Sequence, residues 1–262
     1  MTPESHKLKF AYSTINWSAT CDLPLALSEI RSAGWGAVEL FGHTLDWLGT
    51  LSQLRRHLGD LQVATLFSGI ELPATETQRT TLGNRIAYAA EVGASDFGLV
   101  GGARLRYRPP SDAEYQELTG FCEELAQFGE EHGVTVAYHP HVACTIETSE
   151  EIQKLLSGSD RLRLCLDASH IALVGEDPIE EISRYWNRTS YIHLKDWAKG
   201  KFVELGRGSL GIDFAAILEL LTERRFPGWV VLEQSQSEVS PLESARVNAA
   251  YLQELGYDIG AV

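Results

Sequence analysis

Short apolar segments alternate with longer amphipathic segments along the chain, and this alternation limits the possible folds more than any other feature. Apolar and β-branched residues dominate eight short segments, which are therefore predicted to be buried strands. These strands are predicted at residues 8–13, 37–40, 62–67, 96–100, 135–138, 162–166, 190–194 and 230–233. The fold must therefore bury eight strands and cover them with the segments between them.

The intervening segments have the pattern of helices. Residues 113–132 place apolar side chains on one helical face, and Asp22 followed by Pro24 suits a helix start. Further helices are predicted at 149–156, 178–186, 213–224 and 241–255, and helix ends at Gly34, Gly59, Gly93 and Gly133. Eight strand-then-helix units favour a closed (β/α)8 TIM barrel over an open doubly wound sheet. A barrel of typical size, about 250 residues, would use residues 1–262 as a single α/β domain.

Charge and composition limit the partners. The formal net charge is −14, which repels nucleic-acid phosphates and anionic membranes. No window approaches the roughly 20 unbroken apolar residues of a membrane span. The four cysteines are far apart and the first residues lack a signal-peptide pattern, so we expect a soluble, cytoplasmic protein that binds neither nucleic acid nor membrane.

Four of the predicted strands in the second half of the chain end in side chains that bind divalent metals. Parallel strands of a barrel direct their C-terminal ends to one rim, so these ends predict one shared site. The candidate metal ligands are His139, Asp167, His193 and Glu233. His139 is chosen because it directly follows an apolar run, but His141 and Glu147 are alternatives on the same segment.

Each candidate ligand also has a structural alternative. Asp167 could cap the following helix, His193 could be a hydrogen-bonded core residue, and Glu233 could pair with Arg207. Lys195 lies two residues after His193 and would face the same side of an extended chain, where it could act as an acid or stabilise an oxyanion. The alternative is a surface lysine paired with Asp196.

Other side chains at strand ends are candidates for substrate contacts. His170 could contact a substrate oxygen or act as an acid, or it could simply cap a loop. Glu39 could bind a sugar hydroxyl or form a salt bridge across the rim. The remaining substrate-binding candidates are His43, His141, Trp17 and Arg104, the last in a segment that also holds Arg106 and Arg108 and could equally be a solvated loop.

An ordered set of motifs resembles the xylose isomerase-like TIM barrel family, and the inosose dehydratase branch most closely. The motifs are Tyr138-His139-Pro140-His141, Leu166-Asp167-Ala168-Ser169-His170, His193-Leu194-Lys195-Asp196, Leu205-Gly206-Arg207-Gly208 with Ile212-Asp213-Phe214, and Leu232-Glu233-Gln234. The resemblance implies one divalent ion held by Asp167, His193, Glu233 and a fifth-strand residue. Many relatives have a glutamate on that strand, whereas this chain has His139. Mixed nitrogen and oxygen donors suit Mn²⁺, Co²⁺ or Zn²⁺ better than Mg²⁺.

The chain also departs from the dehydratase pattern. Val142-Ala143-Cys144-Thr145 replaces a Gly-Thr turn, and Ser235 stands where an aspartate is common. These differences imply that substrate contacts differ from those of inosose dehydratase.

The resemblance implies a metal-dependent sugar isomerase, epimerase or dehydratase. Its substrate would be a polyhydroxy ketone, either a keto-sugar or a keto-inositol, and the reaction would pass through a metal-stabilised enediolate. Glu233 or a fifth-strand group would be the base, and Lys195 or His170 the acid. The alternatives are an endonuclease IV-like phosphodiesterase, which the net charge disfavours, and a barrel that binds metal or ligand without turnover. A homo-oligomer is compatible with the sequence.

Overall fold

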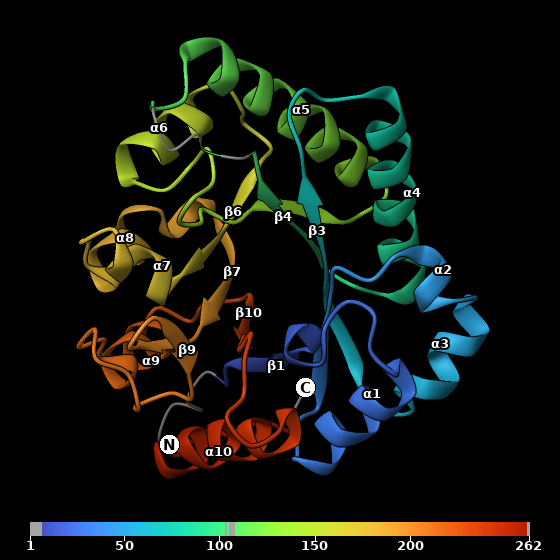
Figure 1. The fold of residues 1–262 in the computed structure, drawn as a ribbon, viewed down its shortest axis with the longest axis vertical. Coiled ribbons are helices and arrows are strands. Elements are labelled where there is room, and N and C mark those ends of the chain that lie inside the picture. Colours follow the sequence, from blue (N-terminus) through green and yellow to red (C-terminus); the bar gives the residue numbers. More distant parts are fainter. Residues whose placement is uncertain (1–6, 103, 105–107, 261–262) are drawn as a thin grey trace, which may run out of the picture.

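The computed structural model describes residues 7–102, 104 and 108–260. Within them, eight parallel strands close into a barrel in the order β1-β10-β7-β6-β5-β4-β3-β2, which confirms the predicted (β/α)8 TIM barrel (Figure 1). The barrel strands are β1 Lys9–Ser13, β2 Ala37–Phe41, β3 Gln62–Ile70, β4 Asp96–Gly101, β5 Thr135–Tyr138, β6 Arg163–Asp167, β7 Thr189–Leu194 and β10 Trp229–Leu232.

Helices surround the barrel, as Figure 1 shows. Asp22 starts the first of them as predicted, because its carboxylate accepts a 3.1 Å hydrogen bond from the Leu25 amide. The helices are α1 Leu23–Ser32, α2 Leu45–Leu48, α3 Leu51–Leu58, α4 Glu76–Val92, α5 Asp112–Glu131, α6 Ser149–Ser157, α7 Ala168–Leu173, α8 Pro178–Arg184, α9 Phe214–Glu223 and α10 Pro241–Glu254. None of the helices in the described part of the chain combines the length and apolar character that crossing a membrane requires.

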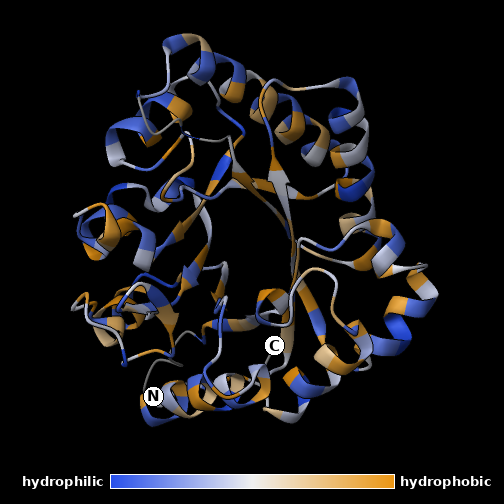
Figure 2. Cartoon of the chain, viewed as in Figure 1, coloured by the Kyte–Doolittle hydropathy of each residue, from blue (hydrophilic) through white to orange (hydrophobic). Residues whose placement is uncertain are grey.

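The hydrophobic residues form two layers. One lies between the strands and the helices, where Figure 2 shows hydrophobic residues on the strands and on helix surfaces beside them. The other fills the barrel with alanines around Phe67, Tyr191 and Trp229. A Cβ on Gly98 would lie 2.2 Å from the Tyr191 hydroxyl and 2.3 Å from the Phe67 ring, so the barrel interior requires a glycine there.

Two of the differences from the prediction concern the strands. Strand β3 continues three residues beyond the predicted 62–67, to Ile70, because it pairs with β4 along its whole second half. The chain after β7 forms a short antiparallel hairpin of β8 Asp196–Ala198 and β9 Lys201–Val203, which was not predicted. Three-residue strands are too short to show an alternating pattern, so the sequence gives no clear signal for them.

Candidate active site

The C-terminal rim of the barrel gathers the four predicted metal ligands. Their donor atoms, one from each residue, all lie within 4.8 Å of one another, and each residue is no more than 4% exposed. They come from successive places on the rim: His139 follows β5, Asp167 ends β6, His193 lies in β7 and Glu233 follows β10. The barrel therefore brings together side chains that are up to 94 residues apart in the sequence.

Lys195 lies inside this cluster. Its Nζ is 3.0 Å from Asp167 Oδ2 and donates a 2.8 Å hydrogen bond to Glu233 Oε1, with 1% of the residue exposed. Burial alone would lower the pKa of Lys195, but the two carboxylates outweigh it and raise the pKa to about 12. Lys195 is therefore a buried ammonium rather than a surface lysine.

Asp196, the alternative partner of Lys195, binds backbone amides instead. Its carboxylate accepts hydrogen bonds from the backbone amides of Trp197, at 2.8 Å, and Gly208, at 2.7 Å. Arg207, the alternative partner of Glu233, has its guanidinium 3.6 Å from Glu204 instead. Asp196 thus fixes the start of the β8–β9 hairpin, while Glu233 pairs with Lys195.

Asp167 serves two purposes. Its Oδ1 accepts hydrogen bonds from the amides of Ser169 (2.8 Å) and His170 (3.1 Å), so it caps α7 as the structural alternative suggested. Its Oδ2 faces Lys195 without forming an aligned hydrogen bond. One oxygen of Asp167 is therefore structural, and the other is directed into the cluster.

His193 connects two carboxylates. Its Nε2 lies 2.9 Å from Glu39 Oε2 and its Nδ1 lies 2.6 Å from Glu233 Oε2. Burial would lower the pKa of His193, but the neighbouring Cys165 thiol and Glu39 carboxylate raise it well above the usual value. Burial likewise would raise the pKa of Glu233, but Lys195 and His193 hold it well below the usual range. These contacts make the cluster a network of ion pairs.

Two further histidines lie beside His139. The His141 ring centroid is 3.7 Å from that of His170, and the His139 centroid is 5.3 Å from it. Burial lowers the pKa of both His139 and His170 well below the usual value, which keeps their imidazoles neutral. Neither ring nitrogen of the buried His170 has a hydrogen-bond partner in the part of the chain that the structure describes. Buried imidazole nitrogens without partners are costly unless they meet a ligand.

Glu39 and His43, proposed as sugar contacts, both have protein partners. Glu39 Oε2 accepts a 2.7 Å hydrogen bond from Thr65 in addition to its contact with His193. His43 bonds Thr14 Oγ1 at 2.8 Å and the Ala19 carbonyl at 2.9 Å. These contacts favour the structural interpretation: Glu39 bridges the rim, and His43 fixes the segments after β1 and β2.

Trp17, another proposed substrate contact, also has partners within the protein. Its indole donates a 2.6 Å hydrogen bond to Glu29, and its ring packs edge-on against Tyr12 at 6.0 Å between centroids. Trp17 thus fixes α1 against the 3₁₀ turn Thr14–Trp17.

Arg104 holds the loop between β5 and α6. Its guanidinium lies 3.3 Å from Glu147, bonds Glu151, and donates to the carbonyls of Cys144 (3.0 Å) and Thr145 (3.3 Å). Glu147 is directed to this loop, so of the three fifth-strand alternatives only His139 is in the four-residue donor group. Arg108 pairs with Glu114, and Arg106 lies outside the described residues.

Phe202 in β9 also lies at the site, although no sequence motif marks it. Its ring centroid is 4.5 Å from Lys195 Nζ and 5.6 Å from the His170 ring, so it covers the cluster from the β8–β9 hairpin. A motif search could not find Phe202, because its contribution depends on a hairpin that folds back over the rim.

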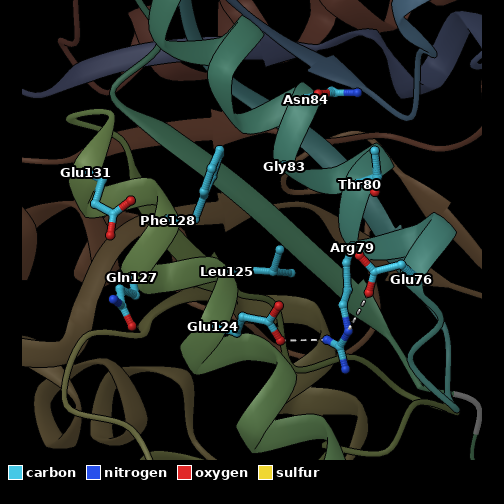
Figure 3. Close-up of a pocket in the computed structure, with 10 residues that line it drawn as sticks. All are labelled: Glu76, Arg79, Thr80, Gly83, Asn84, Glu124, Leu125, Gln127, Phe128 and Glu131. Carbon is cyan, nitrogen blue, oxygen red and sulfur yellow. Dashed lines mark hydrogen bonds and ion pairs between the residues drawn. The ribbon is translucent and has the colours of Figure 1, made fainter.

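A groove of about 480 Å³ lies elsewhere, between α4 and α5 on the outside of the barrel (Figure 3). Arg79 lies in it, 2.6 Å from Glu124 and 3.9 Å from Glu76. The groove lacks the convergent buried histidines and carboxylates of the rim, so the rim is the candidate active site.

The chain belongs to the xylose isomerase-like TIM barrel family, whose model matches residues 27–255. Among curated relatives, inosose dehydratase of Clostridium botulinum is 26% identical over 298 residues, covering 95% of this chain and 98% of the relative. Inosose dehydratase of Clostridium tetani is 28% identical over 291 residues, covering 95% and 97%. These relatives confirm the expected class, an enzyme of the isomerase, epimerase or dehydratase type.

Solved structures share the fold at lower identity. An L-ribulose 3-epimerase is 18% identical with a TM-score of 0.80, covering 95% of this chain and 94% of its own. The IolI protein with a bound zinc atom is 19% identical with a TM-score of 0.76, covering 97% and 98%. At this identity the similarity establishes the barrel alone.

Proposed function

We propose that the chain is a divalent-metal-dependent enzyme that isomerises, epimerises or dehydrates a polyhydroxy ketone. The observation that carries this proposal is the buried cluster of two carboxylates, two imidazoles and one ammonium at the rim. Such a cluster offers metal ligands and proton-transfer groups within one site. A keto-sugar or keto-inositol is the substrate class, in keeping with the names of the curated relatives.

His139, Asp167, His193 and Glu233 would hold the ion. Asp167 Oδ2, His193 Nδ1 and Glu233 Oε2 are buried atoms that have ion-pair contacts but no aligned hydrogen bonds in the described structure, so their lone pairs could bind a cation. His139 Nδ1 lies 3.3 Å from the Cys165 carbonyl, which would leave the Nε2 lone pair for a metal. Two nitrogen and two oxygen donors suit Mn²⁺, Co²⁺ or Zn²⁺, and the zinc in IolI agrees with this choice.

The ion, when bound, would polarise the substrate carbonyl and adjacent hydroxyl and stabilise the enediolate. The side chains perform the proton transfers. Glu233 is the proposed base that removes the proton from the hydroxyl-bearing carbon next to the carbonyl, and Lys195 or His170 is the proposed acid. His170, which burial keeps neutral, would act through its one ring N–H, since neither ring nitrogen has a hydrogen-bond partner among the described residues. Phe202, above Lys195, helps to exclude water.

The fate of the enediolate decides the outcome. Return of a proton gives isomerisation or epimerisation, and loss of a β-hydroxyl gives dehydration. The curated relatives make a keto-inositol the first substrate to test. His141 is the proposed substrate contact nearest to His170, since it is half-buried at the edge of the cluster.

Exchange of the substrate α-hydrogen with deuterated water tests the proposal directly. The protein, loaded with Mn²⁺, Co²⁺ or Zn²⁺, would be incubated with keto-sugars and keto-inositols and followed by NMR. We expect metal-dependent exchange for at least one substrate and its loss in Glu233→Gln. Binding without exchange across the panel would indicate a non-catalytic barrel, and full exchange by Glu233→Gln would exclude this residue as the base.

The cellular setting is proposed from charge and composition. A net charge of −14 and the absence of clustered cysteines favour a cytoplasmic enzyme without a nucleic-acid partner. Incubation with abasic-site DNA checks this, because metal-dependent nicking would support the endonuclease IV-like alternative.

A further inference from the structure

Lys195 contacts the two carboxylates that are proposed to bind the metal. Its Nζ lies 3.0 Å from Asp167 Oδ2 and 2.8 Å from Glu233 Oε1, and Phe202 lies on its other side at 4.5 Å. With 1% of the residue exposed, almost no water can screen these contacts. The positive charge of Lys195 therefore acts on Asp167 and Glu233, termed here the carboxylate pair, at nearly full strength.

Each oxygen of the carboxylate pair already has a contact within the protein. Asp167 Oδ1 accepts two backbone hydrogen bonds that cap α7, so Oδ2 is the oxygen left for an ion, and Lys195 faces it. Glu233 Oε2 lies beside His193, while Oε1 accepts from Lys195. A divalent ion would thus enter a site in which an ammonium already neutralises the available oxygens.

The divalent ion and the Lys195 ammonium would lie too close together for both to bind the carboxylate pair tightly. Metal–oxygen bonds are about 2.1 Å long, so an ion on Asp167 Oδ2 would lie within about 5 Å of the Lys195 Nζ seen here. Like charges at this separation repel strongly in a buried site, where the effective dielectric constant is far below that of water. One of the two must weaken its hold on the carboxylate pair.

We propose that Lys195 is a built-in competitor of the divalent ion: its ammonium holds the carboxylate pair in the metal-free protein, and metal entry displaces it. The displaced ammonium then becomes available to a substrate oxygen, the acid role assigned to Lys195 above. This inference rests on the proposed metal site. It explains how two buried carboxylates remain close together before an ion binds, a state that would otherwise leave charges unpaired.

A thermodynamic cycle fixes the sign of the effect. Removing the ammonium exposes the carboxylate pair to mutual repulsion in the metal-free protein, whereas in the metal-bound protein the ion already neutralises the pair and loses a repulsive neighbour. Lys195→Met should therefore destabilise the metal-free protein more than the metal-bound protein. By linkage, the variant must bind the ion more tightly than the wild type does.

Titration calorimetry with Mn²⁺ and no substrate tests the proposal. We expect Lys195→Met to bind Mn²⁺ at least about tenfold more tightly than the wild type, with a lower melting temperature in the metal-free state. Lys195→Arg keeps the charge and should stay near the wild type. Lys201→Met, which removes an exposed charge from the β8–β9 hairpin, is the matched control and should leave the Mn²⁺ affinity and the melting temperature unchanged.

Affinity that is equal or weaker in folded Lys195→Met would overturn the proposal. If this variant folds only with Mn²⁺, the loaded proteins can be compared by chelator competition. Loss of the ion from the variant at the same or a lower chelator concentration than from the wild type would also overturn the proposal.

Two further outcomes distinguish this inference from the proposed function. Unchanged Mn²⁺ binding by Asp167→Asn would reject the metal site. The expected affinities of the Lys195 variants without any α-hydrogen exchange would reject only the enzymatic activity.

Discussion

His193 in β7 and Glu39 in β2 face each other across the barrel, with His193 Nε2 2.9 Å from Glu39 Oε2 and both residues fully buried. The contact leaves Nδ1 of the same ring directed at Glu233. A carboxylate that holds one imidazole nitrogen fixes the orientation of the ring and the direction of the other nitrogen. Glu39 is thus in a position to orient a ligand of the proposed metal without binding the metal itself.

The first prediction concerns this orientation. Glu39→Gln should lower Mn²⁺ affinity by about tenfold and Glu39→Ala by up to about 100-fold, because such outer partners typically contribute 10- to 100-fold to metal affinity. Calorimetry on the metal-free proteins measures the change. Asp46→Asn, which alters an exposed carboxylate, is the control. Unchanged affinity in both Glu39 variants would mean that His193 does not bind the ion through Nδ1.

A second prediction concerns access to the site. The four proposed ligands are no more than 4% exposed, and Phe202 covers Lys195 and His170 beside them. Phe202→Ala should therefore raise the rate at which a chelator removes the bound ion, by about tenfold, with a smaller change in affinity. Stopped-flow chelation measures the rate, and Phe202→Leu, which keeps an apolar cover, should lie near the wild type. Identical rates for Phe202→Ala and the wild type would show that access runs elsewhere.

The sequence predicted the strands and the four proposed ligands for related reasons. A strand buried on both faces is a continuous apolar run, and a polar residue at its end stands out from that run. Asp167, His193 and Glu233 could therefore be singled out without a structure. Their convergence followed from strand count alone, since parallel strands share one rim.

Side-chain partners could not be predicted in this way. Glu39 and His193 are 154 residues apart, and their contact depends on barrel closure and register. Arg104 was a substrate candidate because it lies in an arginine-rich segment after the fourth predicted strand, but the carboxylates of Glu147 and Glu151 and two backbone carbonyls hold it. Local sequence patterns do not predict contacts between residues that are this far apart in the chain.

A third prediction concerns the barrel interior. Gly98→Ala should destabilise the protein by about 1–3 kcal/mol or more, because the added methyl group would overlap the Tyr191 hydroxyl and the Phe67 ring. Gly120→Ala is a matched control: Gly120 is an exposed residue of α5, and a Cβ there meets nothing within 4 Å. The control should be stabilised by up to about 1 kcal/mol through helix propensity. Urea unfolding measures both, and a neutral Gly98→Ala would contradict the tight interior packing.

The last prediction concerns the pH dependence of stability and involves Asp96, at the start of β4 and remote in sequence from the proposed ligands. Burial raises the pKa of Asp96 above its usual value of 3.8, although Ser95 donates a 2.6 Å hydrogen bond to its carboxylate. The folded protein therefore holds this proton more tightly than the unfolded chain does. The stability that Asp96 contributes is present at low pH and is lost as the pH rises through the folded pKa.

Asp96→Asn cannot ionise, so its stability relative to the wild type should increase from pH 4 to pH 7. The slope approaches about 1.4 kcal/mol per pH unit between the unfolded and folded pKa values, where one extra proton is bound in the folded state. Unfolding free energies from urea titrations of metal-free wild type, Asp96→Asn and the exposed Asp46→Asn give the difference at each pH. A wild-type advantage over Asp96→Asn that grows toward pH 7 would mean that the Asp96 carboxylate is stabilised as the anion, through Ser95 and its neighbours, rather than opposed by burial.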